Sequence, residues 1–133
     1  MYRWHVLRWR YGIVCVVCFF INSYVKGRYL THDRQRVASF NNDPLITRAI
    51  AVNILLDLYK TSERIIRDAA AITLPTQLLI SGDDYVVHRQ PQIDFYQRLR
   101  SPLKELHLLP GFYHDTLGEE NRAQAFEKNA KLY

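Results

Sequence analysis

The chain has 133 residues, enough for one ordinary domain, and its 48% hydrophobic and 23% charged residues exclude an intrinsically disordered protein. The formal net charge of +5 results from 18 basic and 13 acidic residues, and much of the excess lies near the amino end. No nucleic-acid-binding module and no continuous basic stripe accompanies this charge, so nucleic acid is excluded as a partner.

The amino-terminal segment combines a basic start with a short apolar run, Ile13 to Ile21. This run is far below the roughly 18 residues that span a bilayer. It has features of an export-signal core, with Ser23 near a cleavage point, and also of a helix or strand that packs on the body. We predict a cytoplasmic protein, with membrane association or export through residues 1–23 as the alternative.

Two valines separate Cys15 from Cys18 within this run. Zinc sites use such spacing in pairs, and the chain has no second pair of cysteines. Redox motifs need polar surroundings that lower the thiol pKa, whereas these thiols have Val and Phe neighbours. We therefore predict two buried, inert thiols.

Residues 20–71 are predicted to be helical. Asp33 can cap a short helix through Val37, and the sequence from Asn41 to Pro44 predicts a helix that begins at Pro44. A further helix is predicted from Thr61 or Ser62. The apolar residues at helical spacing are assigned to core packing: Ile46, Ile50, Ile54, Leu55 and Leu58, then Ile65, Ile66, Ala69 and Ile72.

Residues 72–133 contain two short apolar runs, Gln77 to Ser81 and Glu105 to Leu109. An amphipathic segment from His88 to about Arg100 joins them, which predicts a strand–helix–strand unit of a parallel sheet. The carboxyl ends of parallel strands form the ligand crevice of such sheets. A last amphipathic helix is predicted between Glu119 and Lys131.

Residue types suited to acid–base chemistry follow both strands. Asp83 and Asp84 follow the first strand and His114 follows the second. A carboxylate that accepts a hydrogen bond from Nδ1 holds the tautomer of a catalytic histidine. Asp84 is preferred because the apolar residues after it would fix the turn, and Asp83 is the reserve. Gly and Asp also favour turns that have no catalytic role.

The other histidines outside the amino-terminal segment are assigned different roles. His88 shares a loop with Asp84 and has no strand of its own to position it as a base. His107 alternates with leucines in the second strand and is predicted to be structural. The neighbours His32 and Asp33 are assigned to a turn.

Several stretches occur in a characteristic order. They are Pro75, Leu78 to Ile80, Gly82 to Val87, Ser101 to Glu105, and Gly111 to His114 with Glu119 five residues on. Their order resembles the C-terminal third of the α/β-hydrolase fold, in particular the monoacylglycerol lipase and lysophospholipase-like serine hydrolases. In those enzymes the corresponding aspartate and histidine belong to the catalytic triad, which points to Asp84 and His114.

The resemblance also covers the stretch from Asn22 to Asp33 and Asn42 to Ile46, which looks like the cap of these lipases. It implies an α/β fold class: the C-terminal portion of an α/β-hydrolase, two parallel strands with flanking helices, preceded by a helical cap segment. The implied parts are residues 1–19 outside the match, residues 20–71 as cap and return helix, and residues 72–133 as the C-terminal part of the core.

The family's nucleophile is a serine in a G-x-S-x-G elbow upstream of the aspartate. None of the serines has glycines at that spacing: Ser23, Ser39, Ser62, Ser81 and Ser101. The resemblance therefore implies hydrolysis of a carboxylic ester, monoacylglycerol or lysophospholipid by a parent enzyme, and a fragment that is inactive alone. It implies no metal or organic cofactor, because the triad works with side chains.

Two alternatives stay open. One is a non-enzymatic remnant that contacts lipid or a membrane through residues 1–21. The other is a protein-interaction domain that pairs with another chain, or with itself, through an uncovered sheet edge.

Overall fold

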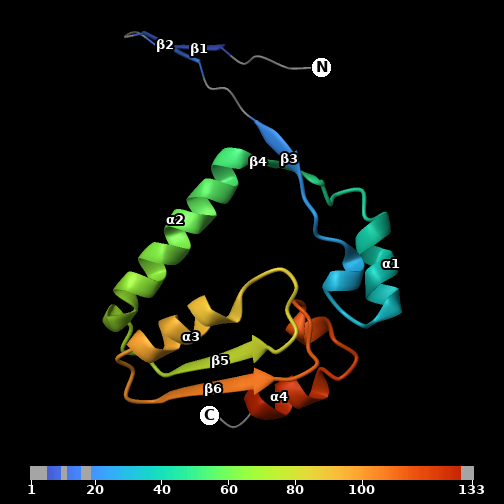
Figure 1. Ribbon diagram of the computed structural model, residues 1–133, viewed down its shortest axis with the longest axis vertical. Helices are drawn as coiled ribbons and strands as arrows, with labels where there is room; N and C mark the ends of the chain where they lie inside the picture. The colour runs from blue at the N-terminus through green and yellow to red at the C-terminus, as the bar shows by residue number, and fades with distance from the viewer. Residues whose placement is uncertain (1–5, 10–11, 16–18, 130–133) are drawn as a thin grey trace.

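The computed structural model describes residues 6–9, 12–15 and 19–129, with side chains from residue 19 to 128. Cys18, the side chain of Cys15 and much of the predicted signal segment lie outside these residues. Figure 1 shows the arrangement of the elements. They are β1 (Val6–Trp9), β2 (Gly12–Cys15), β3 (Phe20–Asn22), η1 (Gly27–Tyr29), α1 (Arg34–Asn42), β4 (Ala49–Ala51), α2 (Val52–Asp68), η2 (Ala69–Ala71), β5 (Thr76–Ser81), α3 (Arg89–Arg98), β6 (Lys104–Leu109), η3 (Thr116–Gly118) and α4 (Ala123–Asn129).

The described strands form three two-stranded sheets. Strands β1 and β2 are antiparallel, as are β3 and β4, whereas β5 and β6 are parallel. In the parallel pair, Thr76 lies opposite Lys104 and Ser81 opposite Leu109, and α3 connects the two strands. The predicted strand–helix–strand unit is confirmed, and each strand begins one residue earlier than its apolar run indicated.

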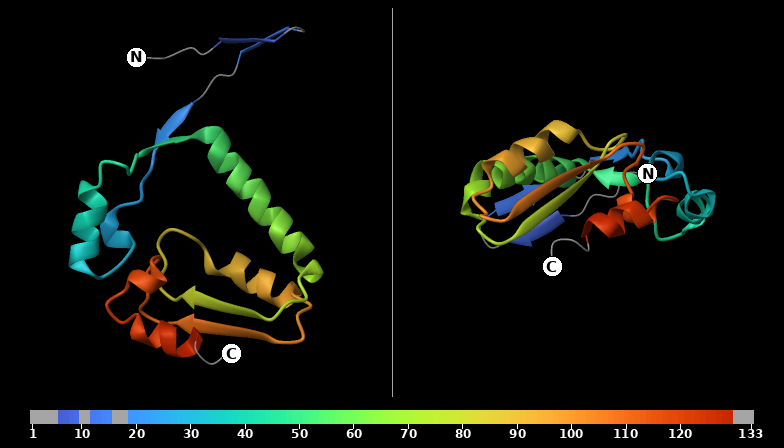
Figure 2. Two further views of the ribbon diagram at one scale, coloured as in Figure 1. Left: turned by 180° about the vertical axis from the view of Figure 1, so that it is seen from behind. Right: turned by 90° about the horizontal axis from the view of Figure 1, so that it is seen from below.

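Helices α3 and α4 cover opposite faces of the parallel pair (Figure 2). Alternate residues of a strand point to opposite faces. Leu78 accordingly lines an apolar pocket with Phe95 of α3, whereas Leu79 packs on the cluster that contains Ala125 of α4. This layered arrangement is the predicted α/β class.

Three buried apolar side chains lie at or just past the carboxyl ends of β5 and β6. Ile80 is 0% exposed, Leu109 4% and Phe112 3%. Fully burying a side chain of this size stabilises a fold by about 1.5–3 kcal/mol. The two loops that leave these strand ends therefore start from a buried, packed part of the described chain.

Helix α1 begins where its cap predicts. The Asp33 carboxylate accepts hydrogen bonds from the backbone N–H groups of Gln35 at 2.9 Å and Arg36 at 3.2 Å. Such a cap satisfies donors that the first helical turn leaves unpaired. The helix continues past the predicted end at Val37 to Asn42.

The predicted helix start at Pro44 is wrong. The Asp43 side chain accepts a hydrogen bond from the N–H of Leu45 at 2.8 Å, and its carbonyl accepts one from Ile46 at 3.2 Å, which makes a turn. The chain then forms β4, where Ile50 lies opposite Ile21 of β3. Pairing with a strand far away in the sequence overrides the local helical spacing of the isoleucines.

The predicted second helix start at Thr61 or Ser62 is also wrong, because α2 is continuous. The Ser62 hydroxyl donates to the carbonyl of Tyr59 at 2.8 Å, a contact that helices accommodate. The core packing expected of these apolar residues is observed at Ala69, which is 0% exposed just after the helix, but not within α2. No residue of α2 is buried, and Ile54 and Leu58 are 52% and 62% exposed.

Among the described helices, none combines the length and the apolar character needed to cross a bilayer.

Candidate active site

Asp84 and His114 meet at the carboxyl ends of β5 and β6. His114 Nδ1 lies 2.9 Å from Asp84 Oδ2, although the residues are 30 positions apart. The two strands are parallel neighbours, so the loops that follow them leave the sheet at the same end, where both strands have their carboxyl termini. The topology thereby brings together the acid and the histidine that the sequence analysis selected.

The carboxylate of Asp84 is fixed by three donors. Its Oδ2 atom faces His114, and its Oδ1 atom accepts hydrogen bonds from the N–H groups of Val86 at 2.7 Å and Val87 at 3.1 Å. Burial of the side chain, which is 5% exposed, raises the pKa of a carboxyl. The hydrogen bonds from His114, Val86 and Val87 outweigh this effect and hold the pKa of Asp84 below its ordinary value of 3.8. Asp84 is an oriented anion at neutral pH.

The His114 ring presents its second nitrogen away from Asp84. When Nδ1–H donates to the carboxylate, Nε2 carries the free lone pair. Within residues 19–128, no hydrogen bond to His114 Nε2 is present, and the side chain is 39% exposed. A neutral imidazole in this tautomer is suited to take a proton from a nucleophile at Nε2.

Asp83 has a different task from its neighbour. Its Oδ2 atom accepts a hydrogen bond from the N–H of Gly111 at 3.0 Å, and its own N–H donates to the carbonyl of Phe112 at 2.9 Å. Gly82 permits this close approach, because a Cβ there would lie 2.7 Å from the carbonyl oxygen of Leu109. The reserve acid therefore ties the two loops together.

Glu119 is a buried carboxylate beside the histidine loop. Its side chain is 3% exposed, and Oε1 accepts a hydrogen bond from the N–H of Tyr113 at 2.8 Å. Its Oε2 accepts from the N–H of His32 at 3.0 Å and the hydroxyl of Thr31 at 3.2 Å. Burial raises the pKa of this carboxyl, but the bonds from His32 and Tyr113 outweigh it, so the pKa of Glu119 lies below its ordinary value of 4.5.

His32 belongs to this neighbourhood, which the sequence analysis did not predict. Its Nδ1 lies 3.1 Å from both oxygens of Glu119, and its ring centroid lies 3.8 Å from that of Tyr113. The residue precedes the helix cap Asp33, so the turn assignment was locally reasonable. Glu119 is 87 positions away, and no pattern in a single sequence indicates such a contact.

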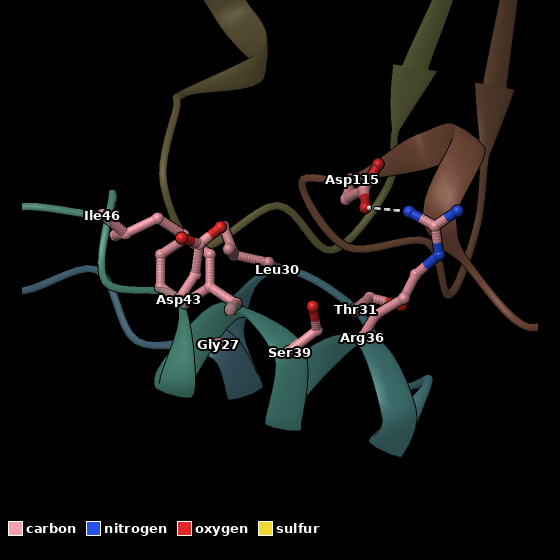
Figure 3. Close-up of a pocket in the computed structure, with 9 residues that line it drawn as sticks. Gly27, Leu30, Thr31, Arg36, Ser39, Asp43, Ile46 and Asp115 are labelled. Carbon is pink, nitrogen blue, oxygen red and sulfur yellow. Dashed lines mark hydrogen bonds and ion pairs between the residues drawn. The ribbon is translucent and has the colours of Figure 1, made fainter.

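A cavity of about 230 Å³ lies on the other side of the histidine loop, between η1, α1 and Asp115 (Figure 3). At one end of the cavity, Arg36 of α1 forms an ion pair with Asp115 at 3.3 Å (Figure 3). Asp115 also donates its N–H to the carbonyl of Leu30 at 2.8 Å. Neither Asp84 nor His114 lines this cavity. The two contacts of Asp115 join the histidine loop to Leu30 and Arg36.

The remaining histidines of the described chain lie apart from this pair. His88 is exposed at the start of α3, and His107 Nε2 lies 3.0 Å from Glu105 Oε2 within β6.

The serine hydroxyls are engaged elsewhere or exposed: Ser81 contacts Thr116 at 2.7 Å and Ser101 donates to Leu103 at 2.6 Å. In residues 19–128, no serine hydroxyl is hydrogen-bonded to His114. Among the described residues, no group of three or more His, Cys, Asp and Glu could hold a metal ion.

Comparison with known protein families assigns the chain to one of them. Residues 2–121 match the family described as Serine aminopeptidase, S33. The chain belongs to this family of α/β-hydrolases. The match begins inside the segment 1–19, which the sequence resemblance left out.

Two curated proteins are similar to the chain. The uncharacterized protein YnbC of Escherichia coli strain K12 is 90% identical over 125 residues, which are 94% of this chain and 20% of that protein. A Schizosaccharomyces pombe protein named "Putative monoglyceride lipase" is 25% identical over 109 residues, which are 82% of this chain and 29% of that protein. The chain therefore spans less than a third of the length of either relative.

Two solved structures share the fold. The monoacylglycerol lipase of Paleococcus ferrophilus superposes with a TM-score of 0.75 at 18% identity, over 84% of this chain and 44% of the lipase. A soluble variant of the Saccharomyces cerevisiae monoglyceride lipase, in complex with a substrate analog, gives 0.71 at 17% identity, over 86% of this chain and 42% of that chain. The parallel strand pair and its helices thus match part of an α/β-hydrolase.

Proposed function

We propose that this chain supplies the acid and the base of a serine hydrolase, and that a serine outside these 133 residues supplies the nucleophile. The observation that carries the proposal is the 2.9 Å contact between His114 Nδ1 and the buried carboxylate of Asp84. Membership of the S33 family supports it independently, as does the sequence position of each residue just past the end of a parallel strand.

The proposed reaction is acyl transfer in two steps. His114 Nε2 takes the serine proton as the serine oxygen attacks the ester carbonyl, and returns that proton to the leaving alcohol as the acyl-enzyme forms. Water then attacks the acyl-enzyme by the same route, which releases the acid and the free serine. Asp84 holds the tautomer of His114 and stabilises the imidazolium formed in each step.

The proposed substrates are carboxylic esters of the monoacylglycerol or lysophospholipid type. This choice rests on the relatives, because the fission yeast protein is named as a monoglyceride lipase and both solved neighbours are lipases of that kind. We further propose three parts in the chain: residues 1–19, a cap and return helix in residues 20–71, and the C-terminal part of the hydrolase core in residues 72–133.

A chimera tests the proposal. The chain replaces the matching 125-residue region of the E. coli protein, and hydrolysis of a monoacylglycerol is measured for the chimera and for the chain alone. We expect turnover by the chimera and none by the chain, which has no serine in a G-x-S-x-G elbow. Asp84→Asn should lower turnover by about 10⁴-fold, because an amide partner favours the wrong tautomer of His114.

His88→Ala serves as the matched control, since His88 is an exposed histidine in the loop of Asp84. The chimera should keep its turnover with this change and lose it with His114→Ala. Equal turnover in the His114→Ala chimera, or turnover by the chain alone that depends on His114, would contradict the proposal.

A second proposal, a protein-interaction module, draws support from the uncovered surface of the described chain. Helix α2 has no buried residue, and Leu56, Leu58 and Tyr59 are 54%, 62% and 66% exposed. Parallel sheets normally have more than two strands, whereas β5 and β6 form a pair among the described residues. Partner chains, including a second copy, could cover these surfaces. An inactive but folded chimera would favour this second proposal.

A further inference from the structure

The backbone on both sides of His114 is held by hydrogen bonds. The N–H of Tyr113 donates to Glu119 Oε1 at 2.8 Å, and the N–H of Asp115 donates to the carbonyl of Leu30 at 2.8 Å. The first of these bonds depends on a side chain, so it can be removed by substitution. The position of the His114 ring relative to Asp84 depends on this stretch of backbone.

Glu119 joins two segments that are far apart in the sequence. The carboxylate that holds Tyr113 also accepts hydrogen bonds from the N–H of His32 at 3.0 Å, the hydroxyl of Thr31 at 3.2 Å and the ring of His32 at 3.1 Å. The single proton of the Thr31 hydroxyl is shared between Glu119 and the carbonyl of Gly118, which lies 2.9 Å away. One carboxylate therefore locks residues 31–32 to the loop that carries His114.

Because Glu119 is buried, its carboxylate needs hydrogen-bond donors from the protein. A carboxylate that is 3% exposed is strongly destabilising unless donors replace its water, and here four donor groups do so. The ring of His32 also stacks on Tyr113, with centroids 3.8 Å apart, next to His114 in the sequence. A side chain with a single acceptor oxygen, such as Gln, could not accept hydrogen bonds from all of these donors at once.

We propose that Glu119 is a positioning residue, which holds the histidine loop against residues 31–32 so that Nδ1 of His114 faces Asp84. Glu119 acts through Tyr113 and His32 and does not contact the reacting atoms. The inference rests on the proposed function for its catalytic meaning, but the geometry it concerns can be measured without any reaction.

The test is the tautomer of His114 in the 133-residue chain, read from the ring ¹⁵N chemical shifts at about pH 8, where an ordinary imidazole is neutral. The wild-type chain should show mainly the Nδ1–H form, because that form donates to Asp84. In Glu119→Gln the amide has one acceptor in place of two, so the Nδ1–H fraction of His114 should fall by at least half. Glu120→Gln is the matched control, since Glu120 is exposed, and should keep the wild-type fraction.

A folded Glu119→Gln chain with the wild-type tautomer of His114 would overturn the proposal. If that variant fails to fold, His32→Ala carries the test, because the His32 side chain is 44% exposed and its loss removes a ring that bonds Glu119 and stacks on Tyr113. The Nδ1–H fraction of His114 should fall there as well. An unchanged fraction in folded His32→Ala would equally overturn the proposal.

The chimera adds a catalytic readout and separates the two claims. Glu119→Gln should lower kcat by about tenfold or more and leave KM within about twofold, because a misplaced base slows the chemical step without removing substrate contacts. If the tautomer of His114 changes in Glu119→Gln but the wild-type chimera is inactive, the role of Glu119 is supported and the proposed function is contradicted. If the chimera is active and its activity depends on His114, but the tautomer does not change in Glu119→Gln, the proposed function is supported and the role of Glu119 is contradicted.

Discussion

Two neighbouring aspartates of one loop carry out different tasks. Asp84 accepts hydrogen bonds from His114 and from two backbone N–H groups, whereas Asp83 accepts one from Gly111 and joins the loops. The preference for Asp84 rests on expected packing of the apolar residues after it, but Tyr85 and Val87 are 57% and 44% exposed. The carboxylate is instead oriented by the backbone N–H groups of Val86 and Val87. A sequence can rank two such acids because the turn that orients one of them is local.

Acid stability should report on the two buried carboxylates. The pKa values of Asp84 and Glu119 both lie below their ordinary values of 3.8 and 4.5, so folding favours their ionised forms. Their contribution is complete above those ordinary values and is lost as the pH falls through the lower, folded-state values.

We therefore expect the free energy of unfolding, measured with urea, to be flat above about pH 6 and to fall below about pH 4.5, by at most about 1.4 kcal/mol per pH unit for each group. Asp84→Asn should make this fall shallower, whereas Glu120→Gln should not change it. A wild-type stability that does not decrease in acid would show that neither carboxylate has the predicted pKa.

Glu119 marks the limit of residue-scale prediction. The motif resemblance noted it five positions after His114, but its partners Thr31 and His32 lie 87 and more positions away. Hydrogen bonds of that range depend on how the segments fold over one another. A single sequence carries no pattern for them.

Among the elements, those with local signals were predicted well. Strands β5 and β6 and helix α3 follow from apolar runs, Pro and Gly boundaries and helical spacing, and each was located within about two residues. The segment from Asp43 to Ala51 was predicted wrongly, because Ile46 and Ile50 have helical spacing while Ile50 belongs to a strand. Its partner Ile21 lies far upstream, and long-range pairing decided the outcome.

The cap of α1 gives a prediction at this scale. Asp33 accepts two backbone hydrogen bonds at the start of the helix, so Asp33→Ala should lower the free energy of unfolding by about 1 kcal/mol. Asp33→Ser retains a capping oxygen and should lose much less. The measurement is urea unfolding at neutral pH, and equal stability of the Ala variant and the wild type would refute the cap's contribution.

At the scale of the whole molecule, the described chain leaves apolar surface uncovered. Leu45 is 89% exposed, Leu74 74% and Tyr59 66%, while the parallel sheet has only two strands. The chain spans 42% and 44% of the two solved lipase structures it resembles. These facts agree with our proposal that the acid and base act beside a nucleophile from another stretch of polypeptide.

The most direct measurement of that proposal is covalent labelling of the chimera with a fluorophosphonate, followed by mass spectrometry of the labelled peptide. We predict one labelled serine, outside the 133 residues, and a labelling rate that falls by about 10³-fold or more with His114→Ala, because the base activates the nucleophile. Labelling of Ser81 or another serine of the chain itself, or a rate that does not depend on His114, would contradict the account.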